Sequence, residues 1–194
     1  MLSLIVLAAG KSTRMRGENK LLAKIGGKPM IRRVVESALA SMVDEVIVVV
    51  GWEAKKIMDA LNNLPCRFVV NKEFRTGQSS SVKVGLKEIR GSADAVLVLP
   101  GDVALIDADS INMVVNAYKN RKSSIVVAAH SGRSGHPVLL SKELFNEIER
   151  IDEATFGLKS VVKRHESEAQ MVETGSERVL RDVDTPEDLK LVMQ

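Results

Sequence analysis

The sequence has 194 residues, of which 45% are hydrophobic and 27% charged, a balance typical of a folded globular protein. A net charge of +3 without a long basic block, together with only 3% aromatic residues, gives no support for nucleic-acid binding. The apolar run Leu4–Ala9 is much shorter than the roughly 20 residues that span a bilayer, and no basic segment precedes it, so we predict neither a membrane span nor a secretory signal. The lone Cys66 excludes an intrachain disulfide and fits a reducing, cytoplasmic location, and we interpret it as a structural thiol.

Strand-like and helix-like segments alternate along the chain, which predicts an α/β fold with a single, mostly parallel, Rossmann-like sheet flanked by helices. The strand-like segments are nearly continuous in Val, Ile, Leu and Ala, as expected where helices cover both faces of a sheet. The predicted strands are Ser3–Ala8, Glu45–Val50, Arg67–Val70, Ala95–Leu99 and Ser124–Ala129. The predicted helices are Pro29–Ser41, Glu53–Leu61, Ser79–Ile89, Ser110–Asn120, Lys142–Arg150 and Phe156–His165.

The final third of the chain has a different pattern. His136–Ser141 and Val179–Val183 are predicted strands, so we expect a small additional β element late in the chain before a short C-terminal helix that opens at Asp184-Thr185-Pro186. Without a linker or an internal repeat, residues 1–194 are predicted to form one domain. Ligands of such sheets bind beyond the carboxyl ends of the strands. This rule selects the loops Ala9–Lys20, Asn71–Ser81 and Pro100–Ile106.

The loop after the first strand reads LAAGKSTRMRGENK from Leu7 to Lys20. Its small residues allow close approach to a ligand, Gly10 can adopt a positive φ, and successive amides in such a turn can bind an anion. Four cations lie within ten residues, as a triphosphate requires; the alternative is a solvated surface turn. Neither the P-loop motif nor the Gly-x-Gly-x-x-Gly dinucleotide fingerprint is present.

This loop resembles the signature loop of the molybdenum cofactor cytidylyltransferases and their wider nucleotidyltransferase relatives, which have a glycosyltransferase-A-like fold. In that family, the loop amides and an arginine hold the triphosphate, and a lysine stabilises charge at the α-phosphate. One departure is Arg16, an extra residue before Gly17, which would shift the approach of the lysine. The resemblance implies that Arg14 and Lys20 are catalytic. It assigns nucleotide binding to Leu7, Ala8, Ala9, Gly10, Ser12, Arg14 and Lys20.

A second matching segment follows the third strand, where Asn71 and Phe74 precede Gly77 and a serine pair. The family uses this region to face the base and sugar, and the start of a helix also attracts anions. An N-cap without a ligand is the structural alternative. The nucleotide-binding positions that the resemblance implies here are Asn71, Gly77, Ser80 and Ser81.

Acidic residues near two later segments predict a metal site. Asp102 follows an apolar strand in Pro100-Gly101-Asp102, where a carboxylate is a suitable ligand for Mg²⁺, and it matches the metal-binding and catalytic aspartate of the family. Asp184, with Asp182 as the alternative, matches the closing motif of the family, although it also suits a helix start. Val103-Ala104 departs from the family, which weakens inference about the acceptor. His136, in Gly-His-Pro, resembles a segment on the acceptor side.

These motifs occur in family order and predict a Mg²⁺-dependent nucleotidyltransferase. A phosphate monoester is nucleophilic at neutral pH, so no general base is required. Because guanylyl-transferring relatives tend to carry glycine in place of Ala9, we expect CTP as donor and molybdopterin as acceptor, with transient contact to a molybdoenzyme or its chaperone. The alternatives are a molybdopterin guanylyltransferase, a sugar-phosphate nucleotidyltransferase, a non-catalytic nucleotide-binding regulatory module and a Rossmann oxidoreductase.

Overall fold

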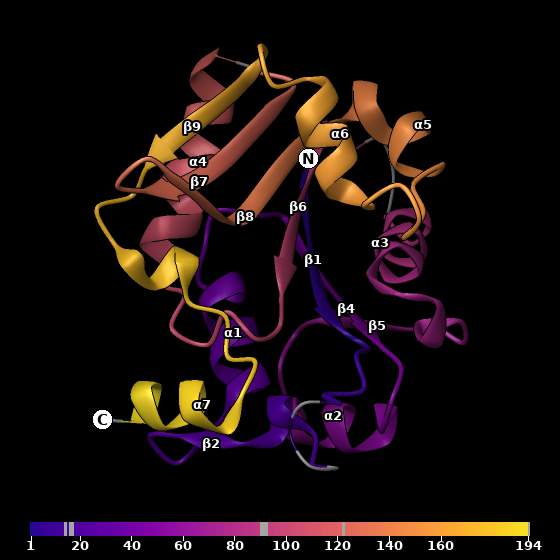
Figure 1. The fold of residues 1–194 in the computed structure, drawn as a ribbon, viewed down its shortest axis with the longest axis vertical. Helices are drawn as coiled ribbons and strands as arrows, with labels where there is room; N and C mark the ends of the chain where they lie inside the picture. Colours follow the sequence, from indigo (N-terminus) through magenta and orange to yellow (C-terminus); the bar gives the residue numbers. More distant parts are fainter. Residues whose placement is uncertain (14, 16–17, 90–92, 122, 194) are drawn as a thin grey trace.

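The computed structural model describes residues 1–13, 15, 18–89, 93–121 and 123–193. A seven-stranded sheet forms its centre (Figure 1), in the order β5-β4-β1-β6-β8-β7-β9. The strands are β1 Leu2–Ala8, β4 Glu45–Val50, β5 Arg67–Val70, β6 Ala95–Pro100, β7 Ile125–His130, β8 Arg133–Ser141 and β9 Ala169–Glu173. No helix within these described ranges is both long and apolar enough to cross a membrane.

The first four strands of the sheet, β5, β4, β1 and β6, are parallel, and β8 lies antiparallel between β6 and β7. The edge strand β9 pairs parallel with β7. This arrangement confirms the predicted mostly parallel sheet with a β element added late in the chain. A separate hairpin of β2 (Lys24–Ile25) and β3 (Lys28–Pro29), which the sequence did not suggest, precedes the first helix.

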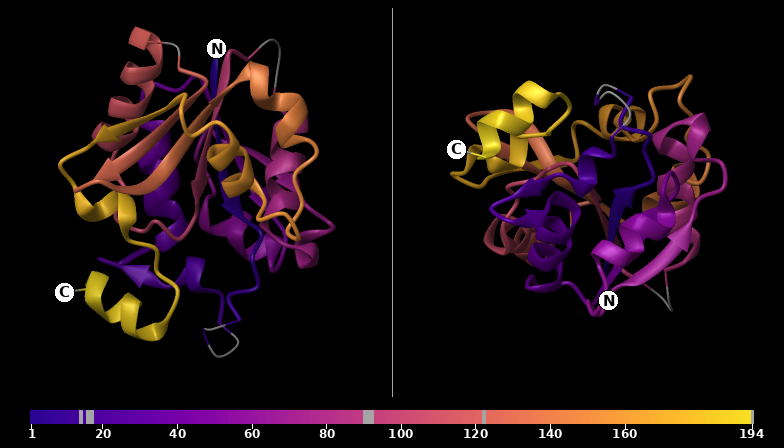
Figure 2. Two further views of the ribbon diagram at one scale, coloured as in Figure 1. Left: turned by 45° about the horizontal axis from the view of Figure 1, so that its top comes forward. Right: turned by 90° about the horizontal axis from the view of Figure 1, so that it is seen from below.

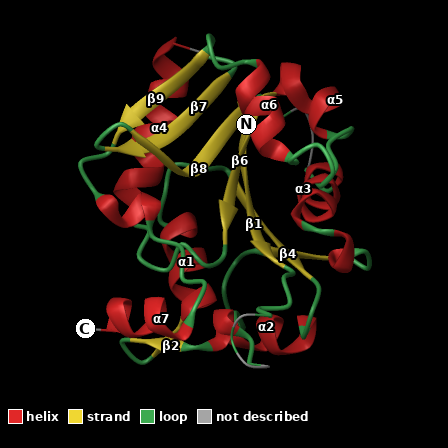
Figure 3. Ribbon diagram, in the orientation of Figure 1, coloured by secondary structure: helices red, strands yellow, loops and turns green. Residues whose placement is uncertain are grey.

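Helices cover both faces of the sheet (Figures 2 and 3), as the apolar strands predict. Alternate residues of β1 divide between two cores: Leu4 and Val6 pack with α1 (Met30–Leu39), α2 (Ala54–Ala60) and α4 (Ala108–Arg121). Ile5 and Leu7 pack with α3 (Gln78–Lys87), α5 (Phe145–Ile148) and α6 (Leu158–Arg164). The last helix is α7 (Pro186–Met193), and the described residues also form the 3₁₀ turns η1 Lys20–Leu22, η2 Phe74–Thr76, η3 Lys142–Leu144 and η4 Glu177–Leu180.

The late elements differ from the sequence-based predictions in three ways. Val179–Val183 is not a strand but the end of η4 and an irregular segment, whose two valines are buried in the core instead of alternating across a sheet. The edge strand β9 was missed, because Ala169–Glu173 is only partly buried and has a mixed composition. The predicted helix from Phe156 begins only at Leu158, because Phe156 and Gly157 have φ values of 63° and 54°.

Candidate nucleotide and metal site

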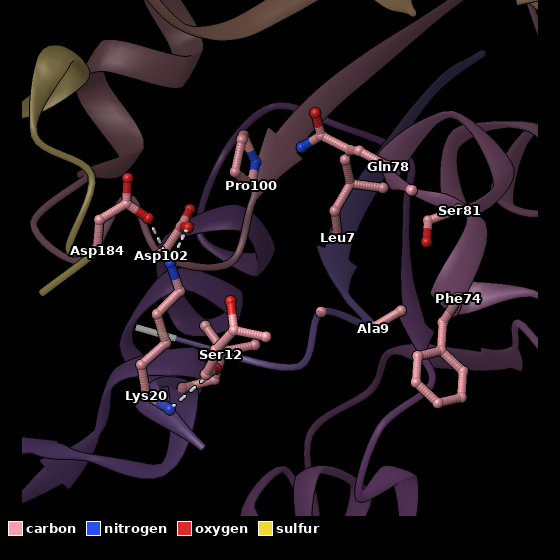
Figure 4. A pocket seen from close by; sticks show the side chains of 14 residues that line it. Leu7, Ala9, Ser12, Lys20, Phe74, Gln78, Ser81, Pro100, Asp102 and Asp184 are labelled. Atoms are coloured by element: carbon pink, nitrogen blue, oxygen red, sulfur yellow. Dashed lines mark hydrogen bonds and ion pairs between the residues drawn. The ribbon is translucent and has the colours of Figure 1, made fainter. Parts of the chain in front are cut away.

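A pocket of about 290 Å³ opens beyond the carboxyl ends of β1 and β6 (Figure 4). One wall comes from the loop after β1, the opposite wall from η2 and the first turn of α3, and the far edge carries two carboxylates. This position agrees with the rule for ligand sites in parallel sheets. The lining residues are Leu7, Ala9, Gly10, Ser12, Thr13, Lys20, Leu21, Phe74, Gly77, Gln78, Ser81, Pro100, Asp102 and Asp184.

Among the described residues of the loop after β1, the one with a positive φ is Ser12. The conformational freedom of glycine favours Gly10 for this conformation. Ser12 has the left-handed φ of 53°, and its hydroxyl oxygen accepts a hydrogen bond from the backbone N–H of Lys20 at 3.2 Å. A Cβ added to Gly10 would meet no atom within 4 Å, so the backbone there has the open space that a ligand needs. Ala8 is buried in the core below the loop, and Arg14 lies outside the described residues.

Lys20 lies between the two acidic residues at the pocket edge (Figure 4). Its Nζ is 2.6 Å from Asp102 Oδ2 and 2.8 Å from Asp184 Oδ1, although the residues are 82 and 164 positions apart. Burial opposes the charged form of this amine, but the two carboxylates outweigh that effect and raise the pKa of Lys20 above its ordinary value. The lysine therefore stays protonated at neutral pH, at a point where it can meet a phosphate.

Thr185 and Asp188, the residues that follow Asp184, form a cap at the start of α7. The side chain of Asp188 accepts hydrogen bonds from the backbone N–H groups of Asp184 and Thr185, and the hydroxyl of Thr185 accepts one from the N–H of Asp188. This reciprocal pair is a capping box. The carboxylate of Asp184 points to Lys20 and the pocket.

Asp102 and Asp184 fit a hard divalent cation. Asp102 Oδ2 and Asp184 Oδ1 both accept a hydrogen bond from the ammonium group of Lys20, so the two carboxylates already share one positive charge. The other oxygen of Asp102, Oδ1, is buried with no hydrogen-bond partner within the part of the chain that the structure describes. Those residues contain no group of three or more His, Cys, Asp or Glu suited to a metal. Mg²⁺ commonly takes one or two carboxylates and completes its shell with water and substrate phosphates, so a pair of aspartates is sufficient.

The residues predicted to face the base lie at the opposite wall of the pocket, where only some of them line the cavity. Asn71 and Ser80 are buried and do not line the pocket that the described residues form; the Asn71 amide donates to Ser80 Oγ at 2.8 Å and to Ser81 Oγ at 3.0 Å. Gly77 and Ser81 do line it. The Asn71 network therefore fixes the first turn of α3, behind the residues that face the cavity.

Two pocket residues on this wall were not among the nucleotide-binding positions predicted from the sequence. The ring of Phe74 and the side chain of Gln78 both border the cavity (Figure 4). An aromatic face suits the stacking of a base, and a side-chain amide can donate to and accept from a base edge. Phe74 was visible as a member of the second motif, whereas no pattern distinguished Gln78 from an ordinary first residue of a helix.

Gly51, at the end of β4, was also missed. A Cβ at this position would lie 2.7 Å from Cβ of Phe74, 2.8 Å from Cβ of Ala9 and 2.9 Å from the carbonyl oxygen of Ala9. Only a residue without a side chain allows the two walls of the pocket to approach each other here. The sequence could not indicate this role, because Gly51 is distant in sequence from both Ala9 and Phe74.

His136 lies beyond the acidic edge of the pocket. The last paired residues of β6 and β8 are Val98 and Val138, and Pro100 and His136 are each two positions further along. The Nδ1 of His136 is buried without a hydrogen-bond partner among the described residues. Burial lowers the pKa of His136, the nearby Asp102 charge opposes this shift, and Lys159 assists it. The predicted histidine therefore lies on the same side of the pocket as Asp102.

Asp182 carries a strongly perturbed carboxyl group in the same region. Partial burial and the charges of Asp102 and Asp184 raise its pKa to about 6, although Lys20 and Lys159 act in the opposite direction. Asp102, Asp182 and Asp184 thus contribute three carboxyl groups to the region beyond the pocket. An anionic ligand can bind in this region only if positive charges offset those of the carboxylates.

Comparisons with known proteins agree with this geometry. The model of the MobA-like NTP transferase domain matches residues 4–169. The bifunctional protein GlmU of Anaeromyxobacter sp. is 35% identical over 132 residues, which cover 66% of this chain and 27% of that protein, so the chain spans about a quarter of this curated relative.

Two solved structures share the fold over nearly the whole chain. A nucleotidyl transferase from Methanothermobacter thermautotroptrophicus has a TM-score of 0.86 at 22% identity and covers 100% of this chain and 96% of its own. Rv0371c from Mycobacterium tuberculosis, in complex with manganese, has a TM-score of 0.80 at 23% identity and covers 99% and 97%. The nucleotidyltransferase fold predicted from the sequence is thus confirmed.

Proposed function

We propose that this chain, which belongs to the MobA-like NTP transferase domain family, uses Mg²⁺ to transfer CMP from CTP to the phosphate of molybdopterin. The observation that carries the proposal is the position of Lys20 between Asp102 and Asp184, at the edge of a pocket whose loop exposes open backbone at Gly10. Transfer of a nucleotide to a phosphate requires a cation, carboxylates that can hold a metal ion and a turn that can bind an anion.

In the proposed reaction, an oxygen of the acceptor phosphate attacks the α-phosphorus of the nucleotide. A new phosphorus–oxygen bond forms, and the bond from the α-phosphorus to the bridging oxygen of the β-phosphate breaks. Pyrophosphate leaves with that electron pair. An acceptor phosphate already carries nucleophilic oxygens near neutral pH, so no proton has to be removed by the protein.

We assign the chain's own residues to three tasks in this reaction. The loop Ala9–Ser12 and Arg14 would hold the triphosphate, and Lys20 would offset charge that develops around the α-phosphate. Asp102 and Asp184 would hold the Mg²⁺. The cation would supply further neutralisation of the phosphate oxygens. Phe74 would stack on the base, and Gln78 and Ser81 would meet its edge, with Asn71 and Ser80 behind them as supports.

The choice of CTP rests on Ala9. This residue lines the pocket and packs at the narrow contact between Gly51 and Phe74, so the change to glycine in guanylyl-transferring relatives would alter the pocket below the base. We further propose that residues 1–194 act as one nucleotidyltransferase domain in the cytoplasm. Release of the product to a molybdoenzyme or its chaperone is part of the same proposal.

Competition between donors tests this function directly. Purified protein, Mg²⁺ and molybdopterin are supplied with equal CTP and GTP, and the two dinucleotide products are separated and counted. We expect the cytidine product to dominate in the wild type and the preference to weaken in Ala9→Gly. Equal or greater use of GTP would favour guanylyl transfer, and turnover only with a sugar phosphate would replace molybdopterin as the acceptor. Binding of CTP without pyrophosphate release would indicate a regulatory module.

A further inference from the structure

The loop between α5 and α6 is attached to the wall of the nucleotide pocket. The carboxylate of Glu153 accepts a hydrogen bond from the backbone N–H of Ser79, in the first turn of α3, at 2.5 Å. Glu153 also lies directly against Gly77, because a Cβ added to this glycine would overlap the side chain of Glu153. Because Gly77 lines the pocket, this loop is fixed to a part of the nucleotide site and not to a remote surface.

A second contact fixes the residue before α6. Gly157 has a φ of 54°, and a Cβ on it would lie 2.6 Å from Oγ of Ser79. Ser79 therefore has neighbours on two sides: Glu153 accepts a hydrogen bond from its amide, and the backbone of Gly157 packs close to its side chain. The start of α6, which lies on the same face of the sheet as α3 (Figure 1), has a defined position relative to the pocket.

Lys159, two residues after Gly157, extends this arrangement toward the acidic edge. The residue is exposed in the first turn of α6, two positions beyond the contact of Gly157 with Ser79, and its positive charge helps to lower the pKa of His136. Among the residues that the structure describes, Lys159 forms no ion pair within 4 Å, whereas Lys20 is held by two carboxylates. Lys159 is thus a cation that a ligand can reach without first breaking a salt bridge.

The negative charge of the nearby aspartates indicates why a cation such as Lys159 would be needed to bind an acceptor phosphate. Asp102, Asp182 and Asp184 together repel a second anion, yet an acceptor phosphate must come within bonding distance of the α-phosphorus. The buried Nδ1 of His136, without a partner in the described ranges, is a further polar group on this side. A phosphate placed between Lys159 and His136 would have one positive charge and one ring nitrogen to bind it.

We propose that Lys159 binds the phosphate group of the acceptor, with Glu153 as the residue that positions the start of α6, and that the acceptor enters between α6 and β8. This inference rests on the proposed function, because it names the acceptor subsite of the same reaction. It adds a binding residue that none of the sequence motifs contains.

Steady-state kinetics separate this role from donor binding. In Lys159→Ala we expect the KM for molybdopterin to rise about tenfold or more, while the Kd for CTP with Mg²⁺, measured by calorimetry, stays at the wild-type value. Lys159→Arg should restore part of the acceptor affinity. Lys163→Ala is the matched control, since Lys163 is an exposed lysine of the same helix near its other end. An unchanged acceptor KM in Lys159→Ala, or an equal loss of CTP affinity, overturns the proposal.

Glu153 has its own pair of variants. Glu153→Gln keeps an oxygen that can accept the hydrogen bond from Ser79, and Glu153→Ala removes it. We expect the alanine variant to raise the acceptor KM and the glutamine variant to stay close to the wild type, with thermal unfolding recorded for both. Equal acceptor KM values in the alanine variant and the wild type would remove Glu153 from its positioning role.

Inorganic phosphate distinguishes a failure of this inference from a failure of the proposed function. Its binding is followed through the backbone amide NMR signals of residues 158–160, without turnover. If the wild type binds phosphate there and Lys159→Ala weakens binding at least tenfold, the subsite stands even where molybdopterin or CTP proves wrong. If the wild type catalyses transfer but neither acceptor KM nor phosphate binding responds to Lys159→Ala, only the subsite is wrong. Absence of phosphate binding in the wild type also counts against the subsite.

Discussion

The backbone N–H of Val183 donates to the carbonyl oxygen of Asp102 at 3.0 Å, across 81 residues of sequence. This hydrogen bond joins the segment before α7 to the end of β6, and the buried side chain of Val183 anchors the segment in the core. The next residue, Asp184, therefore meets Asp102 at a single cation, the Lys20 ammonium group. This backbone contact and the burial of Val183 together bring two carboxylates from distant parts of the chain to one place.

Replacement of Lys20 should reduce catalysis far more than it reduces folding. In Lys20→Ala, we expect transfer to fall by about 10²–10³, the usual effect of losing one preorganised charge partner of a transition state. The same change leaves Asp102 and Asp184 without the cation between them, so tighter Mg²⁺ binding in the absence of nucleotide is a second expected result. Rate assays and metal titration by calorimetry measure the two effects.

Asp184→Asn should change the metal dependence of the reaction and leave α7 intact. Thr185 and Asp188 supply the capping box of α7, so helix stability is expected to change by less than the roughly 1 kcal/mol of a lost cap. The Mg²⁺ concentration for half-maximal transfer should rise several-fold. Asp188→Asn is the comparison variant: it disturbs the cap and should lower the melting temperature with less effect on the Mg²⁺ titration. An unaltered Mg²⁺ requirement in Asp184→Asn would contradict its proposed role as a ligand.

The sequence predicted the sheet and the pocket edge well because their signals are local. Strands such as Glu45–Val50 are continuous apolar runs, and the structure has that strand with the same bounds. Asp102 and Lys20 follow predicted strands, and the topology of a parallel sheet brings such loops to one edge. Their proximity therefore followed from the order of the elements.

Features that depend on long-range contacts were not predictable in this way. The Glu153–Ser79 hydrogen bond joins residues 74 positions apart, and no periodicity marks either partner. Val179–Val183 has the composition of a strand, yet burial of Val179 and Val183 against the core determines its conformation. Asn71 and Ser80 matched a motif, but only the structure shows that they are hydrogen-bonded to each other behind the cavity.

Gly51→Ala should narrow or displace the pocket. The added methyl group would lie less than 3 Å from Cβ of Phe74 and from two atoms of Ala9, and one of those contacts is backbone. Overpacking of this kind typically costs about 1–3 kcal/mol of folding stability. We expect a lower melting temperature and a weaker affinity for CTP than the wild type has. Gly10→Ala, where a Cβ meets no atom within 4 Å, should keep the melting temperature of the wild type.

His136 should make folding stability depend on pH below neutrality. Burial lowers its pKa in the folded protein, whereas the unfolded chain has a pKa near 6.5, so the unfolded state binds more protons between these two values. Stability is therefore expected to be highest above about pH 7 and to fall as the pH drops through 6.5, by at most about 1.4 kcal/mol per pH unit from this one group. Asp102 opposes the shift, so a variant that neutralises Asp102 should lower the pKa of His136 further.

Chemical denaturation at several pH values between 5.5 and 7.5 measures this dependence, with His136→Asn as the variant that removes it. We expect the difference in unfolding free energy between the two proteins to change in favour of His136→Asn as the pH falls. His165→Gln is the matched control, because His165 is paired with Glu147 on the surface of α5, away from Asp102. NMR titration of the His136 ring protons gives the pKa itself, and Lys159→Ala should raise it, since the ammonium group of Lys159 disfavours the protonated ring. A ring that titrates at or above 6.5 in the wild type would contradict the prediction, because burial would then not outweigh the charge of Asp102.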